Sequence, residues 1–154
     1  MESSSILNRK AKYDFFLLEK FEAGIALSGC EVKSVREGKV NLRDSFVRII
    51  RGEAFLFNCH ISPYSRIQGH IEIEAARSRK LLLHKKELER LAVESLRKGY
   101  AIVPVAMYFK RGLIKVEIAL ARGKKMADKR ESIKQRMHEK ESRAAIARHS
   151  RRKG

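Results

Sequence analysis

The chain has 154 residues, 44% of them hydrophobic, which is enough for one compact core and an appendage. Its 35 Lys and Arg against 18 Asp and Glu give a formal net charge of +17, which indicates a polyanionic partner, either nucleic acid or an anionic membrane surface. No segment approaches the run of about 20 apolar residues that spans a bilayer, and residues 1–12 hold no apolar stretch of the kind found in secretory signals.

The N-terminal third predicts strands followed by a short helix. Strand candidates are Tyr13 to Leu18 and Ile25 to Leu27, both rich in residues that favour extended structure. A helix is expected from about Cys30 to Glu37, with Val32 and Val35 buried. Gly38 is expected to end it.

The central part predicts a β-hairpin. Phe46 to Ile50 and Ala54 to Phe57 are two short apolar runs on either side of Arg51-Gly52-Glu53, which is typical of a tight turn. Ile71 to Ile73 is a further strand candidate.

A second helix and a second hairpin follow. Leu88, Leu91, Ala92 and Leu96 form one apolar helical stripe, with Gly99 expected at the position after the helix C-cap. The run Tyr100 to Phe109 is joined through Lys110-Arg111-Gly112 to a strand in which Ile114, Val116, Ile118 and Leu120 alternate with other residues. Pro104 cannot donate to a ladder, so its strand is expected to be at an edge or bulged there.

These elements predict a mainly β fold with inserted helices. Several short antiparallel strands with one or two helices favour a small closed antiparallel barrel that is oligonucleotide-binding-like. Closure would also remove exposed strand edges.

The charge distribution divides the chain near Arg122-Gly123-Lys124. Residues 121–154 carry 13 Lys and Arg against 4 Asp and Glu, so about half of the excess charge lies in less than a quarter of the chain. Asp128 followed by Glu131 resembles a capping-box helix start, but the later apolar positions are few. We therefore expect an RNA-binding barrel over residues 1–122 and a basic tail over 123–154, disordered alone and helical against a partner.

Catalytic chemistry is not indicated. Cys59 and His60 could suggest a nucleophile pair, but neighbours in a strand point to opposite faces. The five His residues lack metal-ligand spacing, and the sequence holds no phosphate-binding loop or dinucleotide fingerprint. Cys30 and Cys59 are expected to be reduced thiols in a reducing compartment. The sequence thus predicts a cytoplasmic protein that is not an enzyme, with no cofactor and no metal.

Three basic clusters indicate where RNA would bind. They are Asn8-Arg9-Lys10-Ala11-Lys12, Arg77-Ser78-Arg79-Lys80 and Lys124-Lys125. Lys and Arg hold phosphates, whereas an interleaved Asn or His can contact unpaired bases. A single charge run is most often a solvated face, but three around one small barrel favour RNA binding. Glu22 is either a turn residue or an acceptor for base N–H groups.

Taken together, several stretches resemble the SmpB family of SsrA-binding proteins, the partners of transfer-messenger RNA in trans-translation. The stretches are Asn8-Arg9-Lys10-Ala11, Phe21-Glu22-Ala23-Gly24, Glu31-Val32-Lys33-Ser34-Val35-Arg36, Gly52-Glu53-Ala54-Phe55-Leu56, Arg77-Ser78-Arg79-Lys80-Leu81-Leu82-Leu83, Gly123-Lys124-Lys125 and Asp128-Lys129-Arg130. The resemblance implies an oligonucleotide-binding-like barrel that binds the tRNA-like domain of transfer-messenger RNA. It also implies entry of the complex into the vacant A site of a stalled ribosome, with the tail in the empty mRNA channel.

The resemblance also implies site residues. Asn8, Glu22, Leu82 and His84 fall at the family's RNA-contact positions, although some members have Asn where this chain has His84. With the basic residues nearby, the predicted RNA contacts are Asn8, Arg9, Lys10, Glu22, Lys33, Arg36, Arg77, Lys80, Leu82 and His84. The predicted ribosome-contacting tail residues are Lys124, Lys125, Asp128, Lys129, Arg130 and His138. Met126-Ala127 lacks the aromatic or His of many members, and His138 stands where some have Trp.

The expected partners are transfer-messenger RNA and the small-subunit decoding centre and mRNA channel of the ribosome, with no membrane, and the protein is expected to be a monomer. Two other functions stay open from the residues alone. A ribosomal protein would carry the same charge signature, and an RNA-modifying enzyme or nuclease would need clustered acids or a cofactor loop.

Overall fold

A closed ring of antiparallel strands forms the body of the protein. The computed structural model describes residues 5–63 and 74–152, with side chains up to residue 147. The elements in chain order are β1 (Ile6–Leu7), α1 (Arg9–Asp14), β2 (Phe15–Ile25), α2 (Gly29–Arg36), β3 (Val40–Asn41), β4 (Phe46–Ile50), β5 (Glu53–Phe57), β6 (His60–Ile61), β7 (Arg79–Leu82), α3 (Lys85–Glu94), β8 (Tyr100–Lys110), β9 (Leu113–Gly123) and α4 (Met126–Arg152).

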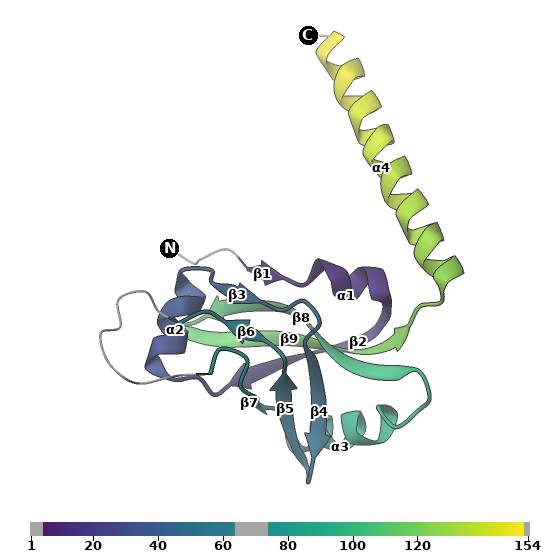
Figure 1. Ribbon diagram of the computed structural model, residues 1–154. Helices are drawn as coiled ribbons and strands as arrows, with labels where there is room; N and C mark the ends of the chain where they lie inside the picture. The colour runs from purple at the N-terminus through teal and green to yellow at the C-terminus, as the bar shows by residue number, and fades with distance from the viewer. Residues whose placement is uncertain (1–4, 64–73, 153–154) are drawn as a thin grey trace. The chain divides into compact units, whose positions relative to one another are not determined.

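The strands follow one another in the order β1-β8-β4-β5-β7-β2-β9, and β9 pairs back with β8 (Figure 1). This pairing closes the sheet and leaves β1 as a short addition to β8. A separate two-stranded ladder joins β3 to β6. The prediction of a mainly β, oligonucleotide-binding-like barrel with inserted helices is confirmed.

Both predicted hairpins are present, with two-residue turns. Arg51 and Gly52 join β4 to β5, and Arg111 and Gly112 join β8 to β9. All four residues have positive φ, between 51° and 77°, which matches the right-handed twist of the strands that they join. Glycine at the second position adopts this conformation without strain.

Pro104 lies at a bulge, as its missing N–H predicts. The register of β8 with β9 shifts between Pro104 and Ala106. Before the bulge β8 pairs with β4 through Ile102 and Val47, and after it β8 pairs with β1 through Ala106 and Leu7. The bulge therefore lets one edge of β8 serve two different strands.

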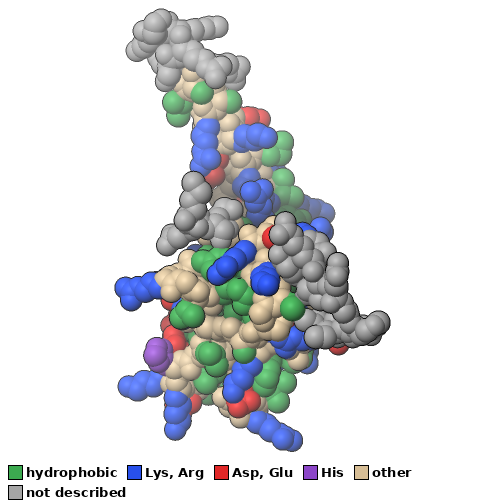
Figure 2. Space-filling view, turned by 90° about the vertical axis from the view of Figure 1, so that its left-hand side faces the viewer, with side chains coloured by type: hydrophobic (Ala, Val, Ile, Leu, Met, Phe, Trp, Pro, Cys, Tyr) green, Lys and Arg blue, Asp and Glu red, His purple; other side chains and the backbone are tan. Residues whose placement is uncertain are grey.

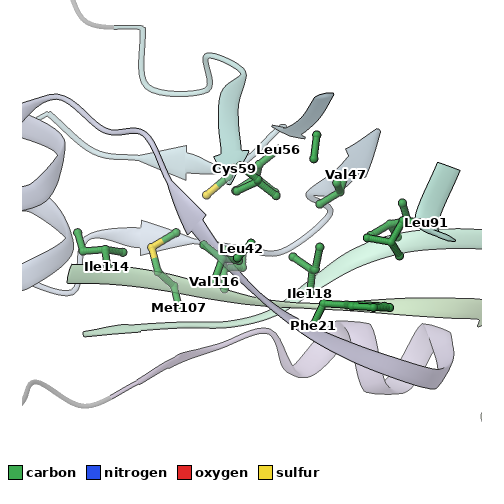
Figure 3. Close-up of a cluster of buried hydrophobic side chains, with 14 of the residues drawn as sticks. Phe21, Leu42, Val47, Leu56, Cys59, Leu91, Met107, Ile114, Val116 and Ile118 are labelled. Atoms are coloured by element: carbon green, nitrogen blue, oxygen red, sulfur yellow. The ribbon is translucent and has the colours of Figure 1, made fainter. Parts of the chain in front are cut away.

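The core lies inside the ring and draws on nearly every strand. Figure 3 shows Phe21, Leu56, Met107 and Ile118 in one cluster of buried side chains, to which four different strands contribute. The alternation of β9 predicted this arrangement, because Ile114, Val116, Ile118 and Leu120 are all buried. Leu91 of α3 is fully buried among them.

The two predicted helices differ in how well their observed ends match the predicted ones. α2 begins with a reciprocal capping box, in which the Glu31 N–H donates to Ser28 Oγ and the Ser28 N–H donates to Glu31 Oε1. It ends before Gly38, which has φ 73° as expected. α3 ends earlier than predicted, at Glu94, so Leu96 is 85% exposed and Gly99 lies in a later turn.

The N-terminal strand predictions were partly wrong. Tyr13 belongs to the short helix α1. β2 is one strand from Phe15 to Ile25, and its register with β9 shifts between Leu17 and Glu19. The helix was missed because six residues carry too little periodicity to outweigh the apolar run that follows. The strand candidate Ile71–Ile73 lies outside the described residues.

Residues Lys124–Gly154 form a separate compact unit from Met1–Gly123. This second unit is one helix, α4, where the sequence predicts disorder in isolation. Met126 to Arg152 contains no Gly or Pro and many strong helix formers, which accounts for a continuous helix. Its side chains are almost all exposed, so this helix has little apolar packing of its own.

Candidate nucleic-acid interface

The outer surface of β2, β7, β8 and β9 gathers residues that are far apart in the sequence. Gly24 of β2 lies opposite Leu82 of β7 on one side and Lys115 of β9 on the other. Lys115 in turn lies opposite Tyr108 of β8. Because alternate residues of a strand share a face, Glu22 lies on this same outer surface. We call this set of strands the Glu22 face.

Glu22 is the centre of a hydrogen-bonded network on that face. Its Oε2 accepts a hydrogen bond of 2.5 Å from the Tyr108 hydroxyl, and Lys110 Nζ lies 3.1 Å from Oε1. These partners, Tyr108 first, lower the pKa of Glu22 below its ordinary value. Desolvation and the hydrogen bond to Glu22 raise the pKa of Tyr108, so its hydroxyl remains a donor. Glu22 is thus an ionised, oriented and exposed acceptor.

An apolar hollow lies beside the Glu22 network. Its volume is about 220 Å³, and its lining includes Gly24, Val32, Leu82, Leu113 and Lys115. A Cβ added at Gly24 would lie 3.3 Å from the Leu82 Cβ, so glycine is what allows the two strands to approach here. Leu82 and Leu113 are 56% and 62% exposed. Figure 2, which looks onto the side where α2 lies, shows hydrophobic side chains among Lys and Arg.

The face can therefore bind an unpaired base in two ways. Apolar side chains can contact its flat surface, and the Glu22 carboxylate can accept from its N–H groups. His84 follows Leu82 by two residues and is exposed at the start of α3, where its N–H donates to Glu87 Oε1 at 3.1 Å. The structure thus places Glu22 and Leu82 on one face and His84 just beyond the end of β7.

Asn8, a predicted RNA contact, has a structural role in the barrel. Its side chain is buried and donates to the carbonyl oxygens of Pro104, at 2.8 Å, and Leu42, at 3.2 Å. It also caps α1 by accepting from the Ala11 N–H. Asn8 therefore attaches α1 to the bulge of β8. Its side chain is buried there, whereas the next residue, Arg9, is exposed at the start of α1.

Arg77 and Arg79, both in one of the basic clusters expected to bind RNA, converge on one buried carboxylate. Glu31 of α2 is 3% exposed and Arg79 is fully buried, with 2.6 Å between Arg79 Nε and Glu31 Oε2. Arg79 also donates to the carbonyl oxygens of Cys59 and Ala75, and Arg77 donates to Glu31 Oε1. Burial opposes ionisation of Glu31, but the hydrogen bonds outweigh it and its pKa lies below the ordinary value. This cluster fixes α2 to the start of β7.

The other predicted basic contacts lie around the barrel on separate elements. Lys10 pairs with Asp44 at 2.5 Å, and Lys80 pairs with Glu53 at 3.2 Å. Arg36 of α2 lies over the Phe109 ring, 5.8 Å from its centroid. Lys33 is exposed on the same helix. These residues do not form a single cluster with Glu22 but lie at separate places around the barrel. We call them the basic surround.

Most of the predicted ribosome-contacting residues of the tail lie at or just before the start of α4. The Lys125 N–H donates to Asp128 Oδ2 at 3.2 Å, so Asp128 is the third residue of the helix and caps it from inside, not from the N-cap position as predicted. Lys124 Nζ donates to Ser132 Oγ at 2.7 Å. Lys129 is half-buried, and Arg130 and His138 are exposed along the helix.

The sequence did not identify Tyr108, Lys110 and Lys115 as site residues. The β8–β9 hairpin pairs Tyr108 with Lys115, and only the long-range pairing of β2 with β9 brings Glu22 beside them. Among the described residues, no helix is long and apolar enough to cross a membrane, and no three His, Cys, Asp or Glu side chains cluster as metal ligands.

Comparison with known proteins gives one consistent family. A family model described as SmpB protein matches residues 5–148. An SsrA-binding protein of Trichodesmium erythraeum is 51% identical over 139 residues, which cover 90% of this chain and 89% of the relative. An SsrA-binding protein of Caldicellulosiruptor saccharolyticus is 56% identical over 137 residues, which cover 88% of this chain and 85% of the relative. A solved structure described as "tmRNA-SmpB: a journey to the center of the bacterial ribosome" is 47% identical with a TM-score of 0.68, covering 80% of this chain and 87% of that one.

Proposed function

Because the chain belongs to the SmpB family, we propose that it binds the tRNA-like domain of transfer-messenger RNA and delivers it to the vacant A site of stalled ribosomes for trans-translation. The observation that carries this proposal is the Glu22 face. There an ionised acceptor, an apolar hollow and flanking lysines lie on one barrel surface, as recognition of unpaired bases in a folded RNA requires.

The tail supplies the second part of the function. α4 is a basic, exposed helix that contributes little to the core, so it is available to follow the phosphates of ribosomal RNA in the empty mRNA channel. Its start is where Lys124, Lys125, Asp128, Lys129 and Arg130 lie. We assign the protein no catalytic role and no cofactor, and we place it in the cytoplasm as a monomer.

The test is to sequence the RNA that co-purifies with the affinity-tagged chain and with a Glu22→Gln variant. Transfer-messenger RNA should dominate with the native chain and fall with the variant. A ribosomal protein would instead remain on intact subunits in equal amount at high salt. Recovery of no transfer-messenger RNA would contradict the proposal.

Salt should weaken the purified complex steeply, since each phosphate that Lys or Arg neutralises releases roughly one counterion. The affinity for a tRNA-like RNA is measured across a salt series, with the native chain and with Glu22→Gln. The variant should bind more weakly at every salt concentration but with the same slope, because Glu22 contacts no phosphate. A flat salt dependence would contradict the role of the basic surround.

A further inference from the structure

Three aromatic side chains lie on the outer surface of the β4–β5 hairpin, where a barrel usually presents polar groups to water. Phe46, Phe55 and Phe57 alternate with the buried residues Val47 and Leu56, so their rings lie outside the core. All three are half-buried. The three rings therefore form one partly exposed aromatic surface rather than single scattered side chains.

Two of the rings form a stack that an arginine extends. Phe46 and Phe57 are cross-strand partners whose centroids are 5.5 Å apart with 15° between their planes. The Arg48 guanidinium carbon lies 5.1 Å from the Phe46 centroid. Arg48 is exposed and lies opposite Phe55 in the ladder. Flat rings and a guanidinium are groups on which bases stack.

The charge around these rings favours an anionic partner. Arg48 and Arg51 are exposed on the hairpin, and Lys80 of β7 lies opposite Phe55. Glu53 is the one carboxylate between Phe46 and Phe57, and it is paired with Lys80. The local excess is thus positive, which fits the phosphates that accompany stacked bases and disfavours a basic protein.

This surface lies across the barrel from β2, which carries Glu22, and from β9, although β4 and β5 pair with β8 and β7. In the closed ring the order is β8-β4-β5-β7-β2-β9, so β4 is as far from β2 as the ring allows, and β5 is as far from β9. In Figure 1 the turn of the β4–β5 hairpin extends away from β2 and β9. An RNA bound around Glu22 therefore leaves the aromatic stack accessible to a second, single-stranded RNA.

We propose that the outer surface of β4 and β5 is a second RNA-binding site, which stacks unpaired bases of single-stranded RNA on Arg48, Phe46 and Phe57. It goes beyond the proposed function because the three stacking side chains lie on β4 and β5, which are not strands of the Glu22 face. Stacking accepts any base, so the site supplies affinity and orientation rather than sequence specificity.

The test is photocrosslinking of the full chain to a short oligouridylate that carries one 5-iodouracil, a base that reacts with side chains on which it stacks. Mass spectrometry should place the crosslink in a peptide containing Phe46 or Phe57. The tail cannot give this result, because residues 124–154 contain no Phe, Tyr or Trp. A saturating tRNA-like RNA should leave the crosslink in place, because Glu22 lies across the barrel from this surface.

Matched variants separate stacking from stability. Phe46→Leu should reduce crosslinking about fivefold or more, whereas Phe46→Tyr should retain it. Thermal melts of both report any loss of folding, and Phe57→Leu replaces Phe46→Leu if that variant unfolds. Crosslinks only at other positions, equal crosslinking by Phe46→Leu, or loss of the crosslink with bound tRNA-like RNA would each overturn the proposal. So would no crosslink at all, which would leave an acidic protein as the partner of this surface.

Discussion

A carboxylate weakens a basic surface for binding phosphates unless it has a hydrogen-bonding role of its own. Glu22 has one, because Tyr108 and Lys110 hold its oxygens at 2.5 and 3.1 Å while it remains exposed. The hydroxyl and the ammonium group both favour the ionised form. The two partners thus orient the acceptor and keep it charged, and neither was visible from the sequence around Glu22.

Replacing the Tyr108 hydroxyl should make RNA binding more sensitive to acid. In Tyr108→Phe the pKa of Glu22 rises toward its ordinary value of 4.5, so the carboxylate is protonated at a higher pH and affinity is lost at a higher pH than in the native chain. At neutral pH we expect a loss of about tenfold from poorer orientation. The measurement is the dissociation constant for a tRNA-like RNA from pH 4 to 7.

Glu22→Gln is the internal control for that series. It should bind weakly at every pH and should lack the transition that Glu22 causes. Tyr100→Phe removes a hydroxyl outside the network, from a ring that lies over Arg97, and should follow the native curve. If Tyr108→Phe also follows it, the hydroxyl does not position Glu22.

The buried pair of Glu31 and Arg79 should be a main determinant of stability. Glu31→Gln leaves the fully buried Arg79 without its counter-charge, and such a loss costs about 3–5 kcal/mol of unfolding free energy. The pKa of Glu31 is lowered on folding, so its stabilisation is complete above its ordinary value of 4.5 and declines as pH falls through the folded value. Denaturant unfolding at pH 7 and at pH 4 measures this. The gap between variant and native chain should narrow at the lower pH, and a constant gap would contradict the assignment.

At the scale of elements, local signals decided which predictions were right. The two hairpins were predictable because each turn has glycine at a positive φ, and α2 was predictable from its apolar pair and Gly38. α1 was missed because it has six residues and its cap, Asn8, makes its decisive bonds to Leu42 and Pro104, which are distant in sequence. The early end of α3 was missed because Leu96 fits the stripe but has nothing to pack against.

The first turn of α4 depends on Asp128. In Asp128→Ala the Lys125 N–H loses its acceptor, and the negative charge that complements the helix dipole is removed. Together these losses should destabilise the helix by about 1 kcal/mol. Far-UV circular dichroism of a peptide spanning residues 121–154 should show less helix when the peptide carries Asp128→Ala than when it has the native sequence. Glu141→Ala, an exposed change in mid-helix, is the control. Equal helix content in all three peptides would show that Asp128 does not cap α4 in solution, and no helix in any would support the sequence-based expectation of a tail disordered alone.

At the scale of the whole molecule, the closed ring is what converts separate sequence signals into a site. Glu22 lies in β2, Leu82 in β7 and Tyr108 in β8, and no local pattern relates them. Their placement follows from β2 pairing with both β7 and β9. The resemblance to the family predicts Glu22 and Leu82 as RNA contacts, but the side chains that hydrogen-bond to Glu22 could be identified only from the pairing of the strands.

Truncation after Gly123 should separate RNA binding from ribosome rescue. β9 ends at Gly123, whose N–H donates to the Gly99 carbonyl oxygen at 2.9 Å, so the ring keeps all of its pairings. The melting temperature and most of the affinity for transfer-messenger RNA should therefore remain, since the Glu22 face is intact. Tagging of a nascent chain on a ribosome with truncated mRNA should be lost, because Lys124, Lys125 and Asp128-Lys129-Arg130 are removed.

A milder variant, with Asp128, Lys129 and Arg130 all changed to Ala, should give the same division and excludes a trivial effect of length. Gel shift, thermal melt and the tagging reaction are measured on the same preparations. Normal tagging by the truncated chain would mean that the tail is only a solvated run of charge. Loss of RNA binding would mean that residues beyond Gly123 belong to the binding unit, because the barrel itself loses no strand in this truncation.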